Sequence, residues 1–174
     1  AIPIERFKET SRASKLKLSV SPFVLRRLKT DKKVISDLPD KIVLNDYCYL
    51  NKSQAVLYEK TLNEMMAKIS EFSGINRRGN IFKLITALKQ ICNHPYQFLK
   101  TGEMSREMSG KLDKCFSLVE TIMERGEKTL IFTQYREMGD ILFKVIENEM
   151  NMTPLFFHGS LTVAQREELI KRFQ

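Results

Sequence analysis

The sequence has no tryptophan, few cysteines and no hydrophobic run long enough to cross a membrane. Its three cysteines, Cys48, Cys92 and Cys115, are odd in number, and none belongs to a CxxC pair of the kind that binds zinc or carries out redox chemistry. Cys92, His94 and His158 match no recognised zinc-ligand spacing. We therefore predict reduced core cysteines, no metal site, no membrane partner and no secretory signal.

The common catalytic signatures are also missing. There is no GxxxxGK[ST] loop to cradle nucleotide phosphates, no acidic strand end to hold magnesium and no Ser/His/Asp or Cys/His nucleophile arrangement. His94 lies beside a proline and His158 beside a glycine, and we interpret both as structural rather than as general bases. The sequence contains no complete catalytic site. Because it begins with Ala1 rather than Met, we expect a piece of a longer protein.

Positive charge is concentrated at the start of the chain. The net charge is +8, and residues 1–33 contain ten Lys or Arg against three acidic residues. The remaining 141 residues are nearly balanced, with 19 basic and 18 acidic side chains. A basic end of this kind indicates contact with phosphates or with an acidic protein surface, and a solvated helix face is the alternative interpretation.

Hydrophobic periodicity predicts a mixed α/β chain. Clean alternation over residues 41–50 is typical of a strand, and short apolar runs predict further strands at 128–133 and 154–158. Asn51 with Gln54 forms a helix-start signal, and Gly126 fits a helix C-terminal cap. Apolar residues recur at helical spacing in the segments 4–18, 51–72, 81–92, 109–125, 136–150 and 162–173. The last two strands are joined through a helix, which predicts parallel pairing.

A possible phosphate site precedes the last helix. Thr162 and Gln165 form a capping box, so a helix begins there, directly after Gly159 and Ser160. Backbone N–H groups, a serine hydroxyl and the positive end of the helix dipole can together hold a phosphate. Arg166, one turn into the helix, adds a possible bidentate contact. The alternative is that the Gly-Ser pair only turns the chain and that Arg166 is solvated.

The end of the predicted strand 128–133 carries two further candidate contact residues. Thr133 and Gln134 end the predicted strand 128–133. Because ligands bind at the carboxyl ends of parallel strands, we expect these two side chains to face the same edge as the Gly-Ser loop.

Four separated segments together resemble one protein family. They are residues 22–29 (PFVLRRLK) with 38–41 (LPDK), residues 88–95 (LKQICNHP), residues 109–112 (SGKL) ahead of 128–134 (KTLIFTQ), and residues 158–160 (HGS) with Arg166 and 172–174 (RFQ). In this order they resemble the SWI/SNF-type DNA-translocating ATPases of helicase superfamily two, from about Phe7 onward. His158 stands where an aspartate is usual, which resembles the prokaryotic branch.

The resemblance implies an α/β fold: a partial RecA-like parallel sheet of the P-loop NTPase type, preceded by a mostly helical insertion. It implies a basic linker after the first lobe at 1–40 and a strand joining the second-lobe sheet at 41–50. The helical insertion, or protrusion, is then expected at 51–108, and a truncated second RecA-like lobe at 109–174.

The resemblance also implies a function for the parent protein: ATP-dependent movement along double-stranded DNA, with ATP and Mg²⁺ bound by the parent and none by this fragment. The family's phosphate loop and acidic motif are expected before Ala1, and its arginine-bearing final motif after Gln174. The expected partners are double-stranded DNA, the first lobe and the rest of the second lobe. The expected location is intracellular: cytoplasm or nucleoid in a prokaryote, nucleus in a eukaryote.

Individual roles follow from the matched positions. The implied DNA-contacting residues are Thr133, Gln134, Gly159, Ser160 and Arg166, and the implied hinge residues between lobes are Arg26, Arg27 and Lys111. A strand-separating helicase or RNA-dependent ATPase on the same lobes is one alternative. A non-enzymatic module that docks its basic end on an acidic protein is another.

Overall fold

The computed structural model describes residues 8–25, 39 and 41–174, which belong to two compact units, Ala1–Asp46 and Tyr47–Gln174. In the described part of the first unit, α2 (Thr10–Val20) is followed by the short 3-10 helix η1 (Ser21–Phe23). No residue of α2 is buried, and its Arg12 pairs with Glu9 at 2.7 Å. The described part of this unit is therefore an exposed helix without a core of its own.

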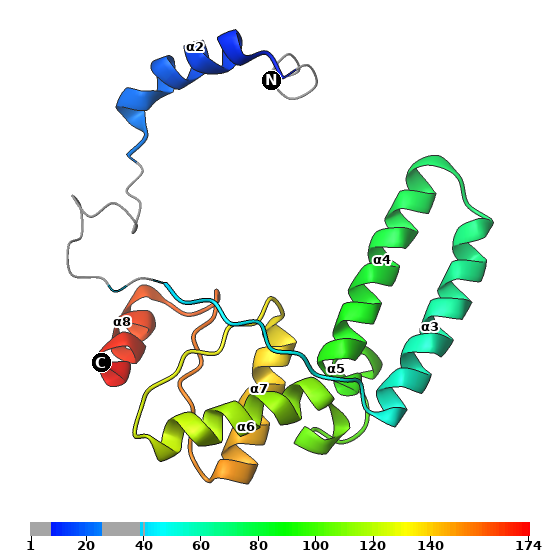
Figure 1. Cartoon of the computed structure of the whole chain (residues 1–174), viewed down its shortest axis with the longest axis vertical. Coiled ribbons are helices and arrows are strands. Elements are labelled where there is room, and N and C mark those ends of the chain that lie inside the picture. The colour runs from blue at the N-terminus through cyan, green and yellow to red at the C-terminus, as the bar shows by residue number, and fades with distance from the viewer. Residues whose placement is uncertain (1–7, 26–38, 40) are drawn as a thin grey trace. The chain divides into compact units, whose positions relative to one another are not determined.

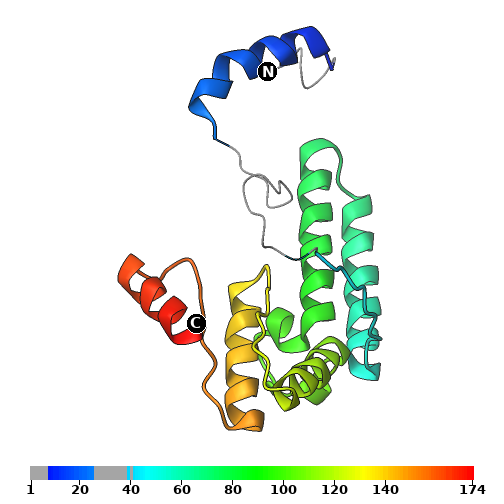
Figure 2. The ribbon, with the colours of Figure 1, turned by 60° about the vertical axis from the view of Figure 1, so that its left-hand side comes forward.

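The second unit is helical in all its described regular structure (Figures 1 and 2). Its elements are α3 (Lys52–Ser70), α4 (Gly74–Asn93), α5 (Pro95–Leu99), η2 (Arg106–Met108), α6 (Gly110–Glu124), α7 (Arg136–Met150) and α8 (Val163–Phe173). Both views show α3 and α4 side by side as a long hairpin, with α5, α6 and α7 at its base. The helices predicted at 51–72, 109–125, 136–150 and 162–173 are confirmed, whereas the helix predicted over 81–92 begins earlier, at Gly74, so the basic segment before it is also helical.

The helix ends follow their sequence signals. Asn51 accepts from the N–H of Gln54 while Gln54 bonds back to the Asn51 N–H, so the predicted capping box is present. Gly126, at φ +70°, donates to Met123, and the next N–H donates to Ile122. These two bonds make a Schellman motif at the end of α6, which confirms the predicted glycine cap.

The hydrophobic core of the second unit lies between α6 and α7. Leu112 and Phe116 of α6 pack against one face of α7, whose buried residues are Met138, Ile141, Leu142, Val145 and Ile146. Apolar residues spaced three and four apart place these side chains on a single stripe of each helix. The α6–α7 pair is therefore the base onto which the other elements are fastened.

The three predicted strands are not formed. In the described ranges 8–25, 39 and 41–174, no residue is in a strand, and segments 41–50, 128–133 and 154–158 have no regular structure. Many of their apolar side chains stay in solvent, since Leu44 is 88% exposed and Phe132 also 88%, although Leu155 and Phe156 are half-buried. Alternation of apolar and polar residues is compatible with a strand, but a strand is stable only with a hydrogen-bonded neighbour and a covered face. For the same reason Cys48 is exposed rather than in a core.

Gln54 ties the hairpin to α6. Its side chain has no solvent exposure, and its Nε2 donates to the carbonyl of Ile91 at 2.8 Å. Its Oε1 accepts from the N–H of Gly110 at 3.1 Å and from that of Asn51 at 3.2 Å. A single buried amide thus joins the start of α3, the end of α4 and the start of α6.

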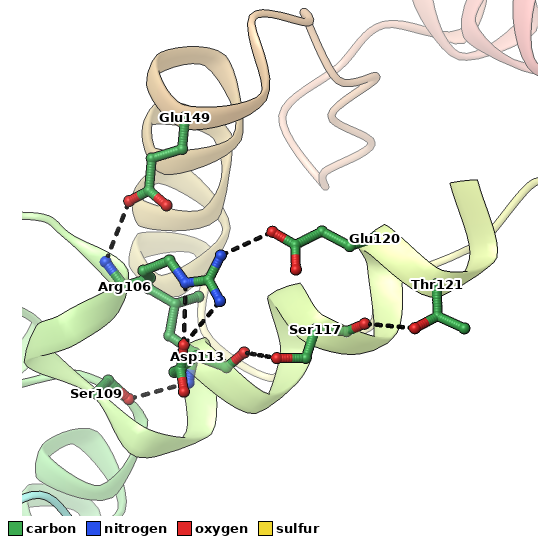
Figure 3. Close-up of polar contacts among 8 residues, drawn as sticks. Arg106, Ser109, Asp113, Ser117, Glu120, Thr121 and Glu149 are labelled. Atoms are coloured by element: carbon green, nitrogen blue, oxygen red, sulfur yellow. Dashed lines mark hydrogen bonds and ion pairs between the residues drawn. The ribbon is translucent and has the colours of Figure 1, made fainter. Parts of the chain in front are cut away.

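Arg106 fastens η2 to α6 and α7 (Figure 3). Its guanidinium donates to Asp113 at 2.9 and 3.0 Å and to Glu120 at 2.8 Å, while its backbone N–H donates to Glu149. The same guanidinium lies 5.6 Å from the ring centre of Phe116. The hydrogen bonds to Asp113 and Glu120 raise the pKa of Arg106. Since both carboxylates are well exposed, each pair stabilises the fold only modestly.

His94 is a buried, neutral link between α4 and α5. Its Nδ1 accepts from the N–H of Tyr96 at 3.1 Å, and its Nε2 lies 3.0 Å from the carbonyl of Ser105. Burial lowers the pKa of His94, and the bond to Ser105 opposes that shift. Nδ1 must be unprotonated to accept, so Nε2 carries the proton and donates to Ser105. The prediction that His94 is structural agrees with these contacts.

Acid should weaken the fold through His94. In the unfolded chain histidine protonates near pH 6.5, above the lowered pKa of folded His94, so the unfolded state binds its proton first as the pH falls. The free energy of unfolding should therefore drop below about pH 6.5, by at most about 1.4 kcal/mol per pH unit. Urea unfolding between pH 5 and 8 measures this. His94→Gln, although less stable throughout, should lack this slope, and parallel profiles for the two proteins would contradict the assignment.

None of the described helices is both long enough and apolar enough to span a membrane.

Candidate nucleic-acid interface

The candidate interface centres on the turn at Gly159 and Ser160, ahead of α8. Thr162 and Gln165 bond reciprocally, at 3.3 Å for Gln165 N to Thr162 Oγ1 and 2.9 Å for Thr162 N to Gln165 Oε1, which confirms the predicted capping box. Both turn residues are exposed. The helix start is therefore fixed in position while the turn in front of it faces solvent.

Arg166 reaches back from α8 onto this turn. Its Nη2 donates to the carbonyl of Gly159 at 2.8 Å, and its guanidinium lies 5.7 Å from the ring centre of Phe157. The Nε of Arg166 is buried and has no hydrogen-bond partner among the described residues. The structure thus brings together two of the predicted contact residues, with the guanidinium held in place by an aromatic face and a carbonyl.

Arg136 also bonds to this turn, and no sequence pattern had predicted it. The Nη1 of Arg136, the first residue of α7, donates to Ser160 Oγ at 2.9 Å. Ser160 Oγ lies 2.8 Å from Nδ1 of His158, so the hydroxyl can accept from the arginine and donate to the imidazole. The available signal was a basic residue opening a helix two positions after Gln134.

His158 was interpreted as structural, and its contacts lie within the candidate site. Its ring centre is 4.9 Å from that of Phe156. The ring is thus oriented by an aromatic neighbour on one side and by Ser160 on the other. It has a positioning part in the turn.

Thr133 and Gln134 lie on the exposed segment that leads into α7. Thr133 Oγ1 accepts from the N–H of Tyr135 at 3.3 Å, and Gln134 is exposed. In the part of the chain that the structure describes, neither side chain bonds to the turn at Gly159 and Ser160. Arg136, just after them, is the residue that links this segment to the turn.

The predicted hinge residues divide into two cases. Arg26 and Arg27 lie outside the described residues. Lys111 donates from Nζ to Asn93 Oδ1 at 2.9 Å, and the neighbouring Ser109 donates to the Asn93 carbonyl. Lys111 therefore joins α6 to the end of α4 and is placed at the junction of the hairpin with the α6–α7 base.

The chemistry of the turn suits an anion rather than a metal. Two guanidinium groups, a hydroxyl and exposed backbone meet there, and neither Arg136 nor Arg166 takes part in an ion pair with a carboxylate in the described segments. No group of three or more His, Cys, Asp or Glu side chains in those segments could hold a metal ion. Guanidinium groups without an acidic partner are suited to phosphate oxygens.

Comparison with known families places the chain. Residues 1–97 match the SNF2-related domain, and residues 110–174 match the helicase conserved C-terminal domain. The chain therefore belongs to the SNF2-related family of helicase-like proteins, and the resemblance read from its four sequence segments is confirmed.

Similar proteins come from all three domains of life. YwqA of Bacillus subtilis is 34% identical over 99% of this chain, which spans 19% of YwqA. The human DNA excision repair protein ERCC-6 is 31% identical over 91% of this chain, which spans 11% of that protein. The solved SWI2/SNF2 ATPase core of Sulfolobus solfataricus in complex with double-stranded DNA is 41% identical, with a TM-score of 0.74, over 92% of this chain and 34% of that one. The chain thus spans about a third or less of each.

Proposed function

We propose that the chain is part of an ATP-dependent double-stranded-DNA translocase and contributes DNA-backbone contacts from its helicase C-terminal region. The observation that carries the proposal is the pair of arginines, Arg136 and Arg166, that hold the exposed turn at Gly159 and Ser160. Membership of the SNF2-related family supports it, as does the likeness to an ATPase core in complex with double-stranded DNA.

In this proposal the turn receives a DNA phosphate. The guanidinium of Arg166 donates to one phosphate oxygen and the backbone N–H groups of the turn donate to others, and the Ser160 hydroxyl can donate to the phosphate once its hydrogen bond to His158 is given up. Thr133 and Gln134 contact a neighbouring part of the backbone. Such contacts position the protein on the duplex without reading the base sequence, as movement along arbitrary DNA requires.

ATP and Mg²⁺ belong to the rest of the parent protein in this proposal. The residues present do not fit a nucleotide site, because the sequence has no GxxxxGK[ST] loop and the described residues offer no acidic cluster for a metal. The described residues therefore act only in binding and orientation.

The domain assignment completes the proposal. Residues 1–40 form a linker after the first lobe, 51–108 form the helical protrusion and 109–174 begin the second lobe of an intracellular protein. Segments 41–50, 128–133 and 154–158 become strands of a RecA-like sheet once neighbouring strands of the parent cover them. Arg26, Arg27 and Lys111 lie at the hinge between the lobes.

ATP hydrolysis by the full-length protein tests the function. It should be stimulated strongly by duplex DNA and weakly by single-stranded DNA or RNA. Preference for single strands or RNA would assign a strand-separating helicase or RNA-dependent ATPase instead. No hydrolysis under any condition would contradict the proposal.

Substitutions at the interface should separate stimulated from basal turnover. Gln134→Ala, Arg136→Ala or Arg166→Ala should lower DNA-stimulated hydrolysis about tenfold and leave the basal rate nearly unchanged, since a lost charge-assisted hydrogen bond costs about 1.5–3 kcal/mol. Lys144→Ala, an exposed lysine of α7, serves as the control. Equal loss of both rates, or no loss, would count against the assigned roles.

A further inference from the structure

The outer face of α4 carries charge of one sign only. The helix contains Arg77, Arg78, Lys83 and Lys89 and no Asp or Glu, and all four cations are exposed. None of them forms an ion pair in the described parts of the chain. The neighbouring helix α3 differs, since it mixes both signs and pairs Lys60 with Glu64. An unneutralised helix of this kind is suited to an anionic partner.

Two of these cations lie with two apolar residues in a stripe along one side of α4. Arg78, Phe82, Ile85 and Lys89 follow one another at intervals of four, three and four residues, so they share one side of α4. The buried residues Leu84, Ala87 and Ile91 lie on the opposite side. The two apolar members of the stripe are well exposed, Phe82 at 70% and Ile85 at 44%. The stripe is therefore a solvent-facing surface with a cation at each end and apolar groups between.

The dimensions of this stripe fit a groove of duplex DNA. Lys89 lies eleven positions after Arg78, which is about 16 Å along a helix axis. The major groove is about 12 Å wide and admits a helix, so cations at the two ends can reach phosphates on both strands. Phe82 and Ile85 would then lie over the groove, where thymine methyl groups offer apolar contact.

We propose that the outer face of α4 is a second duplex-DNA contact, with Arg78 and Lys89 on phosphates of opposite strands and Phe82 and Ile85 over the groove between them. The proposal rests on the proposed translocase function and adds a DNA surface on the helical hairpin to the one at the Gly159–Ser160 turn. Arg77 and Lys83 strengthen the local positive potential without belonging to the stripe.

The salt dependence of duplex binding by the full-length protein tests this. Because each phosphate contact contributes about one unit to the slope of log K against log salt concentration, Arg78→Gln/Lys89→Gln should make that slope shallower by about two. The charge reversal Arg78→Glu/Lys89→Glu should also raise Kd for duplex DNA about tenfold near 0.1 M salt. The matched control Lys52→Glu/Lys144→Glu changes the net charge equally at exposed lysines of α3 and α7.

The outcomes separate the two proposals. The second contact is supported if the wild type binds duplex DNA and only the α4 variants, not the control, make the slope of log K against log salt concentration shallower. Equal slopes and Kd values for the α4 variants and the control would overturn it while leaving the translocase function intact. If the α4 variants bind DNA like the wild type but no longer bind the acidic polypeptide polyglutamate, the proposal is also overturned, and the surface is assigned to a protein partner. No duplex binding by the wild type would instead remove the proposed function itself.

Discussion

Gly110→Ala should lower the free energy of unfolding by about 3 kcal/mol, because the new methyl group has no space. A Cβ atom on Gly110 would lie 2.0 Å from the carbonyl oxygen of Tyr49 and 3.2 Å from its carbonyl carbon. Both are backbone atoms, so the clash cannot be relieved by a change of rotamer. Movement of Gly110 would also break the bond from its N–H to Gln54, which holds the hairpin to α6.

A second glycine supplies the matched control. Gly79 lies inside α4, and a Cβ there meets nothing within 4 Å. Since alanine favours a helix over glycine by about 0.8–1 kcal/mol, Gly79→Ala should stabilise the protein slightly. Urea unfolding followed by circular dichroism measures both variants. Wild-type stability for Gly110→Ala would show that the chain at Tyr49 is not held against α6.

Gln54→Ala should have an effect of similar size for a different reason. The substitution removes the acceptor of the Gly110 N–H and the donor to the Ile91 carbonyl, at a site with no solvent exposure. Each buried polar group left without a partner costs about 1–3 kcal/mol, and a cavity is added, so a loss of about 3–5 kcal/mol is expected. Without the Gln54 hydrogen bonds, the α3–α4 hairpin should also unfold more readily than the α6–α7 core. Amide hydrogen exchange measures this difference.

The second capping box provides the comparison. Gln165 occupies the same position in α8 as Gln54 does in α3, but it is exposed. Gln165→Ala should therefore cost only about 0.5–1 kcal/mol, the usual contribution of an exposed cap. Gln54→Glu keeps one acceptor but sets an anionic oxygen against the Ile91 carbonyl. The stability of this variant should therefore recover as the pH falls, because the protonated carboxyl can donate to that carbonyl. Equal costs for Gln54→Ala and Gln165→Ala would contradict a role for burial.

The sequence by itself determined most of the helices, several of their ends and the family, but not the start of α4 at Gly74, seven residues before the predicted segment. Helix starts at Asn51 and Thr162 and the stop at Gly126 depend on hydrogen bonds between residues a few positions apart, and such bonds form wherever the local pattern is present. The family could be recognised because four short motifs occur in order along the chain.

Only the tertiary structure decided what distant residues do together. Alternation over 41–50 predicted a strand, yet a strand depends on a neighbour that local sequence does not specify, and the segment stays irregular in the structure. Arg136 and Ser160 are 24 positions apart, and Gln54 and Gly110 are 56 apart, so neither contact has a periodic signature. The Gln54–Gly110 pair forms where α3, α4 and α6 meet, and the Arg136–Ser160 pair forms where Phe156, ahead of the turn, packs on α7. This packing between distant segments is a property of the whole unit.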